Sequence, residues 1–376
     1  MITARQLNRT TLARQLLLER VPLEVPDAVR RIAALQAQEP ASPYVALWNR
    51  IAGFDAADLD TAFAERAVVK ASLMRITLHA VHADDYPPFH AAMTQTLRAS
   101  RLYDKRYTST GLTVADADEA VPHLRKYTEH PRTGAEIEAH FDETFGPATD
   151  TRLWWALKTF GPLHHAVTTK PWSFGLRPSY RAAPKLRKPL LREAAIQHLV
   201  RRYLGAFGPA SVLDIAQFTM VLRPAVREAL AALGEDVVEL EGADRTTLYD
   251  VSDGLIADAD TPAPPRLLPM WESCLLAYSD RSRIIPPDYR KIVIRTNGDV
   301  LPALLVDGYV AGVWRPVDGG IEATAFDKLP KLAWDELAAE ARRLVAFLAD
   351  RDPNVYRRYA RWWATLPAAQ QRVLPG

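Results

Sequence analysis

Hydrophobic and polar positions along the chain repeat one order of elements, in which helices are followed by a short β ribbon. In residues 5–20 leucines recur at helical spacing beside arginines. Residues 68–81 are instead rich in apolar and β-branched side chains, which predicts one long strand or two short ones. Ribbons are also expected at 163–180 and 237–251, each after further helices, one of which begins with capping-box spacing at Thr133 and another with Ser211 as its cap. Helices that lead into a small ribbon indicate a winged helix-turn-helix, so the sequence predicts three such units in tandem.

The last third of the chain has a different pattern. A proline-rich linker at 261–265 precedes an amphipathic helix at 332–348 and an aromatic-rich helical tail at 354–364. Between the linker and the helix, strands are expected at 291–295, 303–306, 309–314 and 320–325. These form a small antiparallel, barrel-like β module. The fold class is therefore α+β, with units expected at 1–114, 115–188, 189–260 and 261–376.

Composition excludes several classes of protein. The chain has 376 residues, of which 48% are hydrophobic and 24% charged, as in an ordinary soluble protein. No apolar run reaches the ~20 residues that cross a bilayer, and the start lacks the apolar core of a signal peptide. Cys274 is the single cysteine, which excludes an internal disulfide and a cysteine-based zinc site. We expect a cytoplasmic monomer.

Charge and motif searches reveal no cofactor. The net charge is only +2, and the basic residues are mostly arginine, which suits phosphate but also follows from a GC-rich genome. His164, His165 and the acidic residues show no metal-ligand spacing. No phosphate-binding glycine loop of the P-loop or dinucleotide kind occurs. We therefore predict neither a metal nor a cofactor.

The candidate chemistry lies in residues 35–40, Leu-Gln-Ala-Gln-Glu-Pro, after a helix expected to begin at an Asp27 N-cap. Proline at position 40 disfavours helical geometry at the residue before it. If the stretch is extended, the carboxamides of Gln36 and Gln38 point to the same side, whereas on a continuing helix they diverge. The alternative, which spacing alone favours, is that they cap the helix end and contact solvent.

Several motifs together resemble one known family. They are residues 35–40, Met-Arg-Ile-Thr-Leu-His at 74–79, Leu-Pro-Met-Trp-Glu at 268–272, Asp-Arg-Ser-Arg at 280–283 and residues 306–314. In this order they resemble the winged-helix DNA-binding proteins that include the bacterial AlkZ-type DNA glycosylases. The resemblance spans nearly the whole chain. It implies tandem winged helices around a concave DNA-binding surface, followed by the β module.

The resemblance also implies a catalytic signature, glutamine–apolar–glutamine, which falls here on Gln36, Ala37 and Gln38. A related branch carries aspartate at its second polar position, and this sequence departs from it. Two neutral amides are weaker than the carboxylates of most glycosidases. They suffice where the leaving group is good, as in a purine that is cationic after alkylation at N7. The pair thus predicts removal of cationic, N7-alkylated purines. The resemblance implies that these include bulky adducts and interstrand crosslinks from genotoxic natural products.

No lysine is placed as a Schiff-base nucleophile, so we predict a monofunctional DNA glycosylase that leaves an abasic site. Its expected partner is double-stranded DNA containing alkylated or crosslinked purines. Each DNA-contact candidate has a structural alternative, as an exposed charge, a hydrogen-bonded histidine or a packed tryptophan. The candidates are Arg31, Arg50, Lys70, Arg75, His79, Lys170, Trp172, Arg177, Trp271, Arg281 and Arg283. For Arg75, His79, Trp271, Arg281 and Arg283 the resemblance carries the prediction.

A second hypothesis keeps the fold and drops the catalysis: a winged-helix transcription regulator or a protein that sequesters a drug. Fold alone does not separate the two. The glutamine pair does, because a regulator has no need of two amides on one face. A regulator is also expected to dimerise on its site, and no heptad seam is present.

Overall fold

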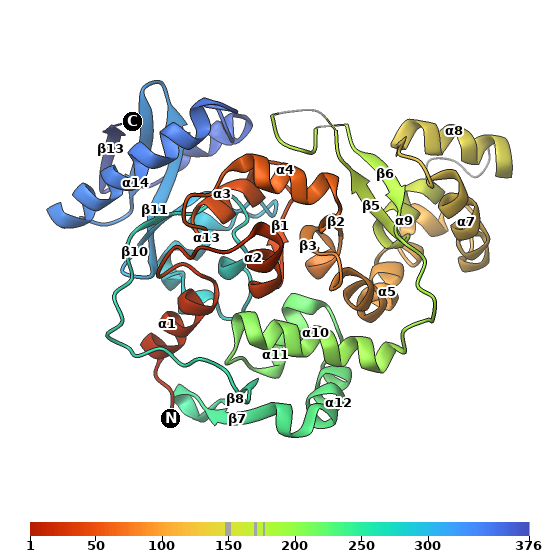
Figure 1. The fold of residues 1–376 in the computed structure, drawn as a ribbon, viewed down its shortest axis with the longest axis horizontal. Helices are drawn as coiled ribbons and strands as arrows, with labels where there is room; N and C mark the ends of the chain where they lie inside the picture. The colour runs from red at the N-terminus through yellow and green to blue at the C-terminus, as the bar shows by residue number, and fades with distance from the viewer. Residues whose placement is uncertain (147–151, 169–170, 176, 376) are drawn as a thin grey trace.

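The computed structural model describes residues 1–146, 152–168, 171–175 and 177–375. It is an α+β fold of many helices and small antiparallel sheets (Figure 1). The first helices and strands are α1 (Ala4–Arg14), α2 (Val25–Arg31), β1 (Leu35–Gln36), α3 (Ser42–Trp48), α4 (Ala56–Ala64), β2 (Val68–Ser72), the 3-10 turn η1 (Met74–Ile76), β3 (Leu78–His82), α5 (Tyr86–Leu102) and α6 (Lys105–Thr108). Strands β1, β3 and β2 form a sheet in that order. Residues 68–81 are therefore two strands.

Two helix boundaries differ from the prediction. The second helix begins at Val25 with Glu24 as N-cap, so the N-cap predicted at Asp27 is wrong. Pro26 lies in the first turn, where its fixed φ suits a helix and its missing N–H costs nothing. The first helix ends at Arg14, short of the predicted residue 20, because Leu16 is left-handed with φ of 56°.

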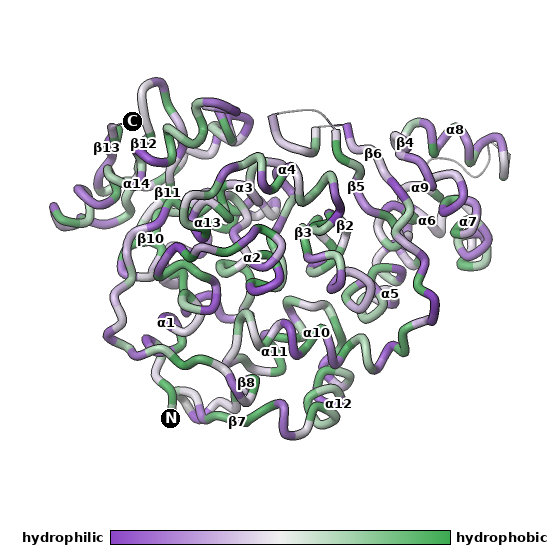
Figure 2. Tube along the Cα trace, in the orientation of Figure 1, coloured by the Kyte–Doolittle hydropathy of each residue, from purple (hydrophilic) through white to green (hydrophobic). Residues whose placement is uncertain are grey.

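The second group of elements comprises α7 (Val114–Tyr127), β4 (Arg132–Thr133), α8 (Gly134–Phe145), α9 (Arg152–Phe160), β5 (Leu163–Ala166) and β6 (Ser179–Ala182). In Figure 1, α7 and α8 project at the right of the molecule. The capping box predicted at the start of α8 is confirmed, since Glu136 N donates to Thr133 Oγ1 and Thr133 N to the Glu136 carboxylate. Figure 2 shows the alternating hydrophobic and hydrophilic positions along α7.

The third group comprises α10 (Arg192–Phe207), α11 (Val212–Thr219), α12 (Arg223–Leu233), η3 (Gly234–Asp236), β7 (Val237–Glu241), η4 (Ala243–Arg245) and β8 (Thr247–Val251). The predicted Ser211 cap and the predicted hairpin are both present. A small ribbon thus accompanies each of the three groups. Their interpretation as winged helices, and the division of the chain into four units, stay predictions.

The C-terminal part comprises β9 (Arg266–Leu267), η5 (Ser273–Leu275), η6 (Arg281–Arg283), η7 (Pro287–Tyr289), α13 (Arg290–Val293), β10 (Ala303–Val306), β11 (Tyr309–Val317), β12 (Gly320–Ala325), α14 (Lys331–Ala349), η8 (Arg357–Thr365) and β13 (Gln370–Pro375). The strands form one open sheet in the order β13-β12-β11-β10-β9, so the barrel-like closure is not present. The strand predicted at 291–295 is wrong, because most of it lies in helix α13.

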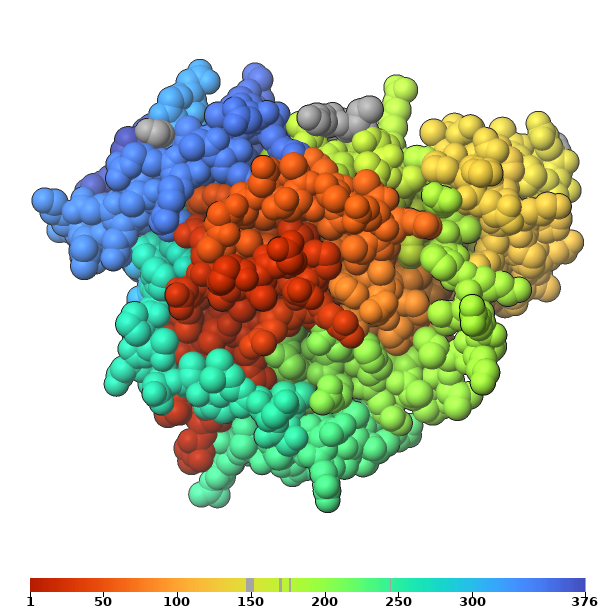
Figure 3. Space-filling view, viewed as in Figure 1, coloured from red at the N-terminus to blue at the C-terminus, as the bar shows by residue number. Residues whose placement is uncertain are grey.

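The sheet β1-β3-β2 lies between two hydrophobic clusters. Leu35, Val68 and Ala80 pack into one cluster with α3, α4, α14 and the C-terminal sheet. The alternate positions Val69 and Val81 pack into the other, with α5, α9 and α10. Since successive strand residues point to opposite faces, one short sheet separates the two cores. The space-filling view in Figure 3 shows the N-terminal part of the chain lying against the C-terminal part.

A buried ion pair joins the N-terminal and C-terminal parts. The Arg50 guanidinium donates to both Glu272 oxygens, at 2.8 and 3.1 Å, and both side chains are fully buried. Arg50 also donates to the Ala46 carbonyl at 2.9 Å, and Cys274 N donates to Glu272 at 3.3 Å. Arg50 was predicted to contact DNA, and this burial corrects that assignment, because a buried and paired guanidinium cannot reach a phosphate.

We expect Glu272→Ala to lower the free energy of unfolding by about 3–5 kcal/mol, because it leaves the buried Arg50 charge without a partner. Urea unfolding followed by circular dichroism measures the change. The matched control is Asp236→Ala, which breaks the exposed Arg201–Asp236 pair at 3.6 Å and should change little. Equal effects of the two variants would contradict the role given to burial.

Candidate active site

Strand β1 fixes the backbone that carries the two glutamines. Gln36 lies opposite His79 of β3, and Ala37 N donates to the Leu78 carbonyl at 2.8 Å, so the chain is extended through Ala37. Leu35 and Ala37 point into the core, and alternation therefore turns Gln36 to the other face. The backbone bends at Gln38, which is exposed, whereas Gln36 is only 5% exposed. Helix α2 ends at Arg31, so neither glutamine caps it.

Ser273 holds the strand in place from the C-terminal part of the chain. Gln36 N donates to the Ser273 hydroxyl at 3.2 Å, and that hydroxyl donates to the Ala34 carbonyl at 3.2 Å. Ser273 directly follows Glu272, the partner of Arg50. On the other side, Leu78 N approaches Gln38 Oε1 at 3.5 Å. The backbone of the glutamine segment is thus held by Ser273, which lies more than 200 positions away in the sequence.

A neutral histidine and two arginines lie on the Gln36 side of the sheet. His79 is 1% exposed, its Nδ1 lies 3.2 Å from the Thr77 carbonyl, and burial lowers the pKa of His79 to about 3. The nearby Arg75 charge lowers that pKa further. With the Gln217 amide turned so that its nitrogen donates to the Tyr278 carbonyl, its oxygen accepts from Arg75 and Arg281 at 3.3 Å.

These two guanidiniums converge without an ion pair in the described part of the chain. Burial lowers the pKa of Arg75, and burial followed by the Arg75 charge lowers the pKa of Arg281 to about 10. Arg75 is also left-handed, with φ of 58°, a backbone conformation that commonly marks functional sites in proteins. The structure therefore brings together four of the predicted site residues, namely Gln36, Arg75, His79 and Arg281, and adds Gln217.

Gln38 faces a cleft of about 420 Å³ in which every charged lining side chain is basic. Its charged side chains are Lys70, Arg101, Lys158 and Arg358. Burial lowers the pKa of Lys70 to about 8, partly offset by Glu39, and its ammonium lies 4.6 Å from the centre of the Phe174 ring. A cleft with this charge suits a polyanion such as a nucleic acid strand.

No sequence pattern indicated Arg101, Lys158 and Arg358 as residues of this cleft. They come from α5, α9 and η8, and each lies in an ordinary amphipathic stretch. Arg101 is held by the Thr159 hydroxyl at 2.8 Å and lies over the Trp155 ring. Arg358 pairs with Glu39. Only the folded chain brings these charges to Gln38, and no local spacing marks them.

The remaining predicted DNA contacts divide by exposure. Arg31 and Arg177 are exposed, and Lys170 lies outside the described residues. Trp172 is 5% exposed and packs on Tyr44 with ring centres 4.9 Å apart, so its assignment as a base-stacking residue is corrected. Trp271 is likewise buried, with its indole N–H donated to the Gly298 carbonyl at 2.9 Å.

The prediction of His79 as a phosphate contact is corrected, whereas the half-buried Arg283 stays a predicted contact. The Arg283 guanidinium lies 3.8 Å from the centre of the Tyr278 ring and donates to the Pro209 carbonyl at 2.9 Å, so it joins elements within the protein. His79 is buried and neutral at physiological pH, which removes it from the phosphate contacts. Its place opposite Gln36 makes it a support of the strand instead.

Comparison with known proteins shows the family of this chain. A model of the family described as DNA glycosylase AlkZ-like matches residues 29–347. The chain belongs to this family, and its enzyme class is DNA glycosylase. It is 25% identical over 362 residues to the Interstrand DNA cross-link repair glycosylase of Streptomyces sahachiroi, covering 90% of this chain and 95% of that one.

The fold is similar to the solved structure of Streptomyces sahachiroi DNA glycosylase AlkZ, with a TM-score of 0.81. That match covers 94% of this chain and 98% of the other at 21% identity, so it establishes the α+β fold. No helix in the described ranges is long and apolar enough to cross a membrane. Within the same ranges, no three metal-ligating side chains gather closely enough to hold an ion.

We expect His79 to make stability depend on acid. Its pKa is near 6.5 unfolded and about 3 folded, so between these values the unfolded state binds the extra proton. The free energy of unfolding therefore falls as the pH falls from 6.5 towards 3, by up to about 1.4 kcal/mol per pH unit. His79→Gln should remove that share of the slope.

Urea unfolding at several pH values between 7.5 and 4.5 measures this slope. The control is His130→Gln, because His130 is exposed and should leave the slope as in the wild type. A wild-type slope in His79→Gln would mean that His79 titrates normally in the folded protein.

Proposed function

We propose that this DNA glycosylase hydrolyses the N-glycosidic bond of N7-alkylated, cationic purines, including bulky adducts and interstrand crosslinks from genotoxic natural products. The observation that carries the proposal is the glutamine segment, in which the chain is extended through Ala37 and then bends, so that the Gln38 amide lies at a cleft whose charged side chains are all basic. The name of the Streptomyces sahachiroi relative supports the crosslink as substrate. Self-resistance and DNA repair are the biological roles that fit such lesions.

The chemistry follows from what the site offers. Departure of the base leaves positive charge on the sugar, and an amide carbonyl can stabilise that charge while the second amide positions the attacking water. An N7-alkylated purine already carries the charge that makes it a good leaving group, so it needs no acid. Neutral bases such as uracil need stronger catalysis and are excluded as substrates in this proposal.

Glu39 is the nearest carboxylate in sequence, and its contacts argue against a role as base. It pairs with Arg358 and accepts from the Tyr359 hydroxyl at 3.2 Å. Burial raises its pKa while Arg358 opposes that shift. A carboxylate with these partners serves to anchor the glutamine segment to η8. Catalysis is then left to Gln36 and Gln38, with Arg75 and Arg281 near the Gln36 side as sources of positive charge for the backbone of the DNA.

The proposal includes a monomeric, monofunctional enzyme that leaves an abasic site. In this proposal the three helical groups and their ribbons are tandem winged helices that surround double-stranded DNA. Within this arrangement the exposed Arg31 and Arg177 are DNA contacts, as the sequence predicts, and Arg101 and Lys158 are added from the cleft. Lys70 is only 4% exposed, so it contributes positive charge to the cleft and no direct phosphate contact. Phosphate contacts of this kind position the duplex and carry no sequence preference.

Single-turnover base release from duplex DNA with an N7-alkylguanine or its crosslink tests the proposal, with alkali revealing abasic sites. Wild type should release the base, and Gln36→Ala and Gln38→Ala should each slow release at least tenfold, or ~1.4 kcal/mol of barrier. Gln95→Ala, at an exposed position of α5, is the matched control. Because Gln36 is buried, thermal unfolding must show that its variant is folded. Binding without base release by wild type would favour the non-catalytic regulator or sequestering protein.

Salt dependence tests the basic cleft separately from catalysis. The affinity for duplex DNA should fall steeply with salt, because phosphate contacts release counterions. Lys158→Gln and Arg101→Gln should each weaken binding and lower the slope of log K against log salt by about 1. Arg342→Gln, at an exposed position of α14 that does not line the cleft, should leave that slope unchanged. Unchanged slopes in the cleft variants would place the DNA elsewhere on the protein.

A further inference from the structure

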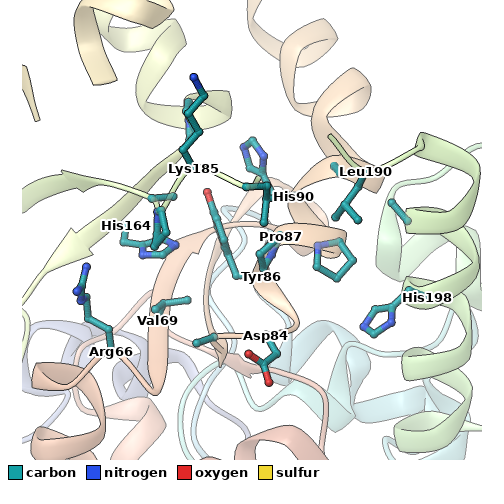
Figure 4. A pocket seen from close by; sticks show the side chains of 18 of the residues that line it. Arg66, Val69, Asp84, Tyr86, Pro87, His90, His164, Lys185, Leu190 and His198 are labelled. Carbon is teal, nitrogen blue, oxygen red and sulfur yellow. The ribbon is translucent and has the colours of Figure 1, made fainter. Parts of the chain in front are cut away.

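A second cavity, of about 930 Å³, lies apart from the cleft at Gln38. It is enclosed by β2, β5, α5, α10 and the segment between β6 and α10 (Figure 4). It shares no lining residue with the Gln38 cleft. Its volume is within the range of small-molecule binding sites, which is about 300–1,000 Å³. The proposed DNA chemistry uses none of its residues, so the cavity calls for its own explanation.

Two buried polar atoms at this cavity have no hydrogen-bond partner in the described part of the chain. They are the Tyr86 hydroxyl and His164 Nε2, on side chains from residues that are 4% and 8% exposed. The two rings meet edge to face with centres 4.2 Å apart, and His90 stacks on Tyr86 at 5.4 Å. Figure 4 shows the hydroxyl between the His164 and His90 rings. Buried polar groups are normally satisfied, so each of these two groups still has the capacity for one more hydrogen bond.

The protonation of these groups defines what they can bind. Burial raises the pKa of the Tyr86 hydroxyl, which therefore stays protonated and can donate. Burial, with smaller contributions from His90 and Arg66, lowers the pKa of His164 to about 3, so its ring is neutral. A neutral imidazole can either donate or accept at Nε2. Together they offer a donor and an adaptable second group to one ligand oxygen.

The other lining residues of the cavity offer a ligand apolar contacts and positive charge. The walls are apolar, with Val69, Pro87, Pro162, Leu186 and Leu190 among the lining residues. Basic side chains at the lining are Arg66, Arg125 and Lys185, none of which forms a salt bridge in the described ranges. Of the two acidic ones, Glu65 and Asp84, the latter already lies 3.8 Å from Arg30. The basic side chains of the lining outnumber the acidic ones, so its net charge is positive, which favours an anion.

We propose that this cavity binds a small aromatic carboxylate. Its ring lies against the apolar walls and the Tyr86 and His90 rings, in the offset or edge contacts that aromatic groups prefer. One carboxylate oxygen accepts from the Tyr86 hydroxyl and reaches His164 Nε2. The negative charge faces Arg66 and Arg125. The site is independent of base excision, since its lining residues are separate from those of the cleft.

Titration calorimetry on the full chain tests the proposal, with indole acetate as the aromatic acid and methylindole as its uncharged counterpart. We expect saturable binding of indole acetate and binding of methylindole that is at least tenfold weaker. Tyr86→Phe removes a hydroxyl that has no partner, so it should fold normally and bind the acid about tenfold more weakly. Ala194→Trp places a large ring at an exposed lining position and should abolish binding.

Two controls separate this site from general charge and from the DNA cleft. Lys188→Gln lies in the same connecting segment without lining the cavity and should bind as wild type does, whereas Arg66→Gln should weaken binding of the acid alone. A duplex oligonucleotide should not displace the acid. Absence of saturable binding, equal binding by Ala194→Trp, or displacement by DNA would overturn the proposal, and none of these results bears on base release.

Discussion

The buried contact between Arg50 and the segment that begins at Glu272 is the constraint on which the candidate active site depends. Glu272 neutralises Arg50 inside the core, and the next residue, Ser273, holds both Ala34 and Gln36 through its hydroxyl. A charge pair this deep is costly to desolvate and is tolerated only when its hydrogen bonds are satisfied. Those same bonds fix where the segment lies, and therefore where the first glutamine lies. Stability and the placement of the Gln36 amide share one set of contacts.

The sheet β1-β3-β2 explains how a two-residue strand can matter so much. Its one face packs with the C-terminal sheet and its other with α5, α9 and α10. A shift by one residue would exchange the two faces and move Gln36 from the side of His79 to the side on which Leu35 and Ala37 pack. Register is therefore strongly specified even though β1 is short. The bend at Gln38 then brings the second amide out of the sheet to the basic cleft.

Much of the fold could be predicted from local pattern, since capping boxes at Thr133 and Ser211 and the hairpin at 237–251 are local signals. The same method missed β1, β9 and β13, because each is too short or too polar to stand out and forms only through pairing with distant strands. The glutamine stretch could be selected by resemblance, whereas the burial of Arg50 and Trp172 could not. Exposure of a single arginine or tryptophan depends on tertiary partners such as Glu272 and Tyr44, which lie far away in the sequence.

The order in which the chain is synthesised has a consequence for this site. Strand β1 emerges from the ribosome early, yet Ser273, which binds its backbone, and Arg358, which pairs with Glu39 just beyond it, emerge only after most of the chain has been made. Until then the segment with the glutamines lacks its anchors and the first hydrophobic cluster lacks its C-terminal half. Contacts of such large sequence separation slow folding and leave apolar surface exposed meanwhile. A nascent or truncated chain that ends before Ser273 would thus lack the contacts that fix the glutamine segment.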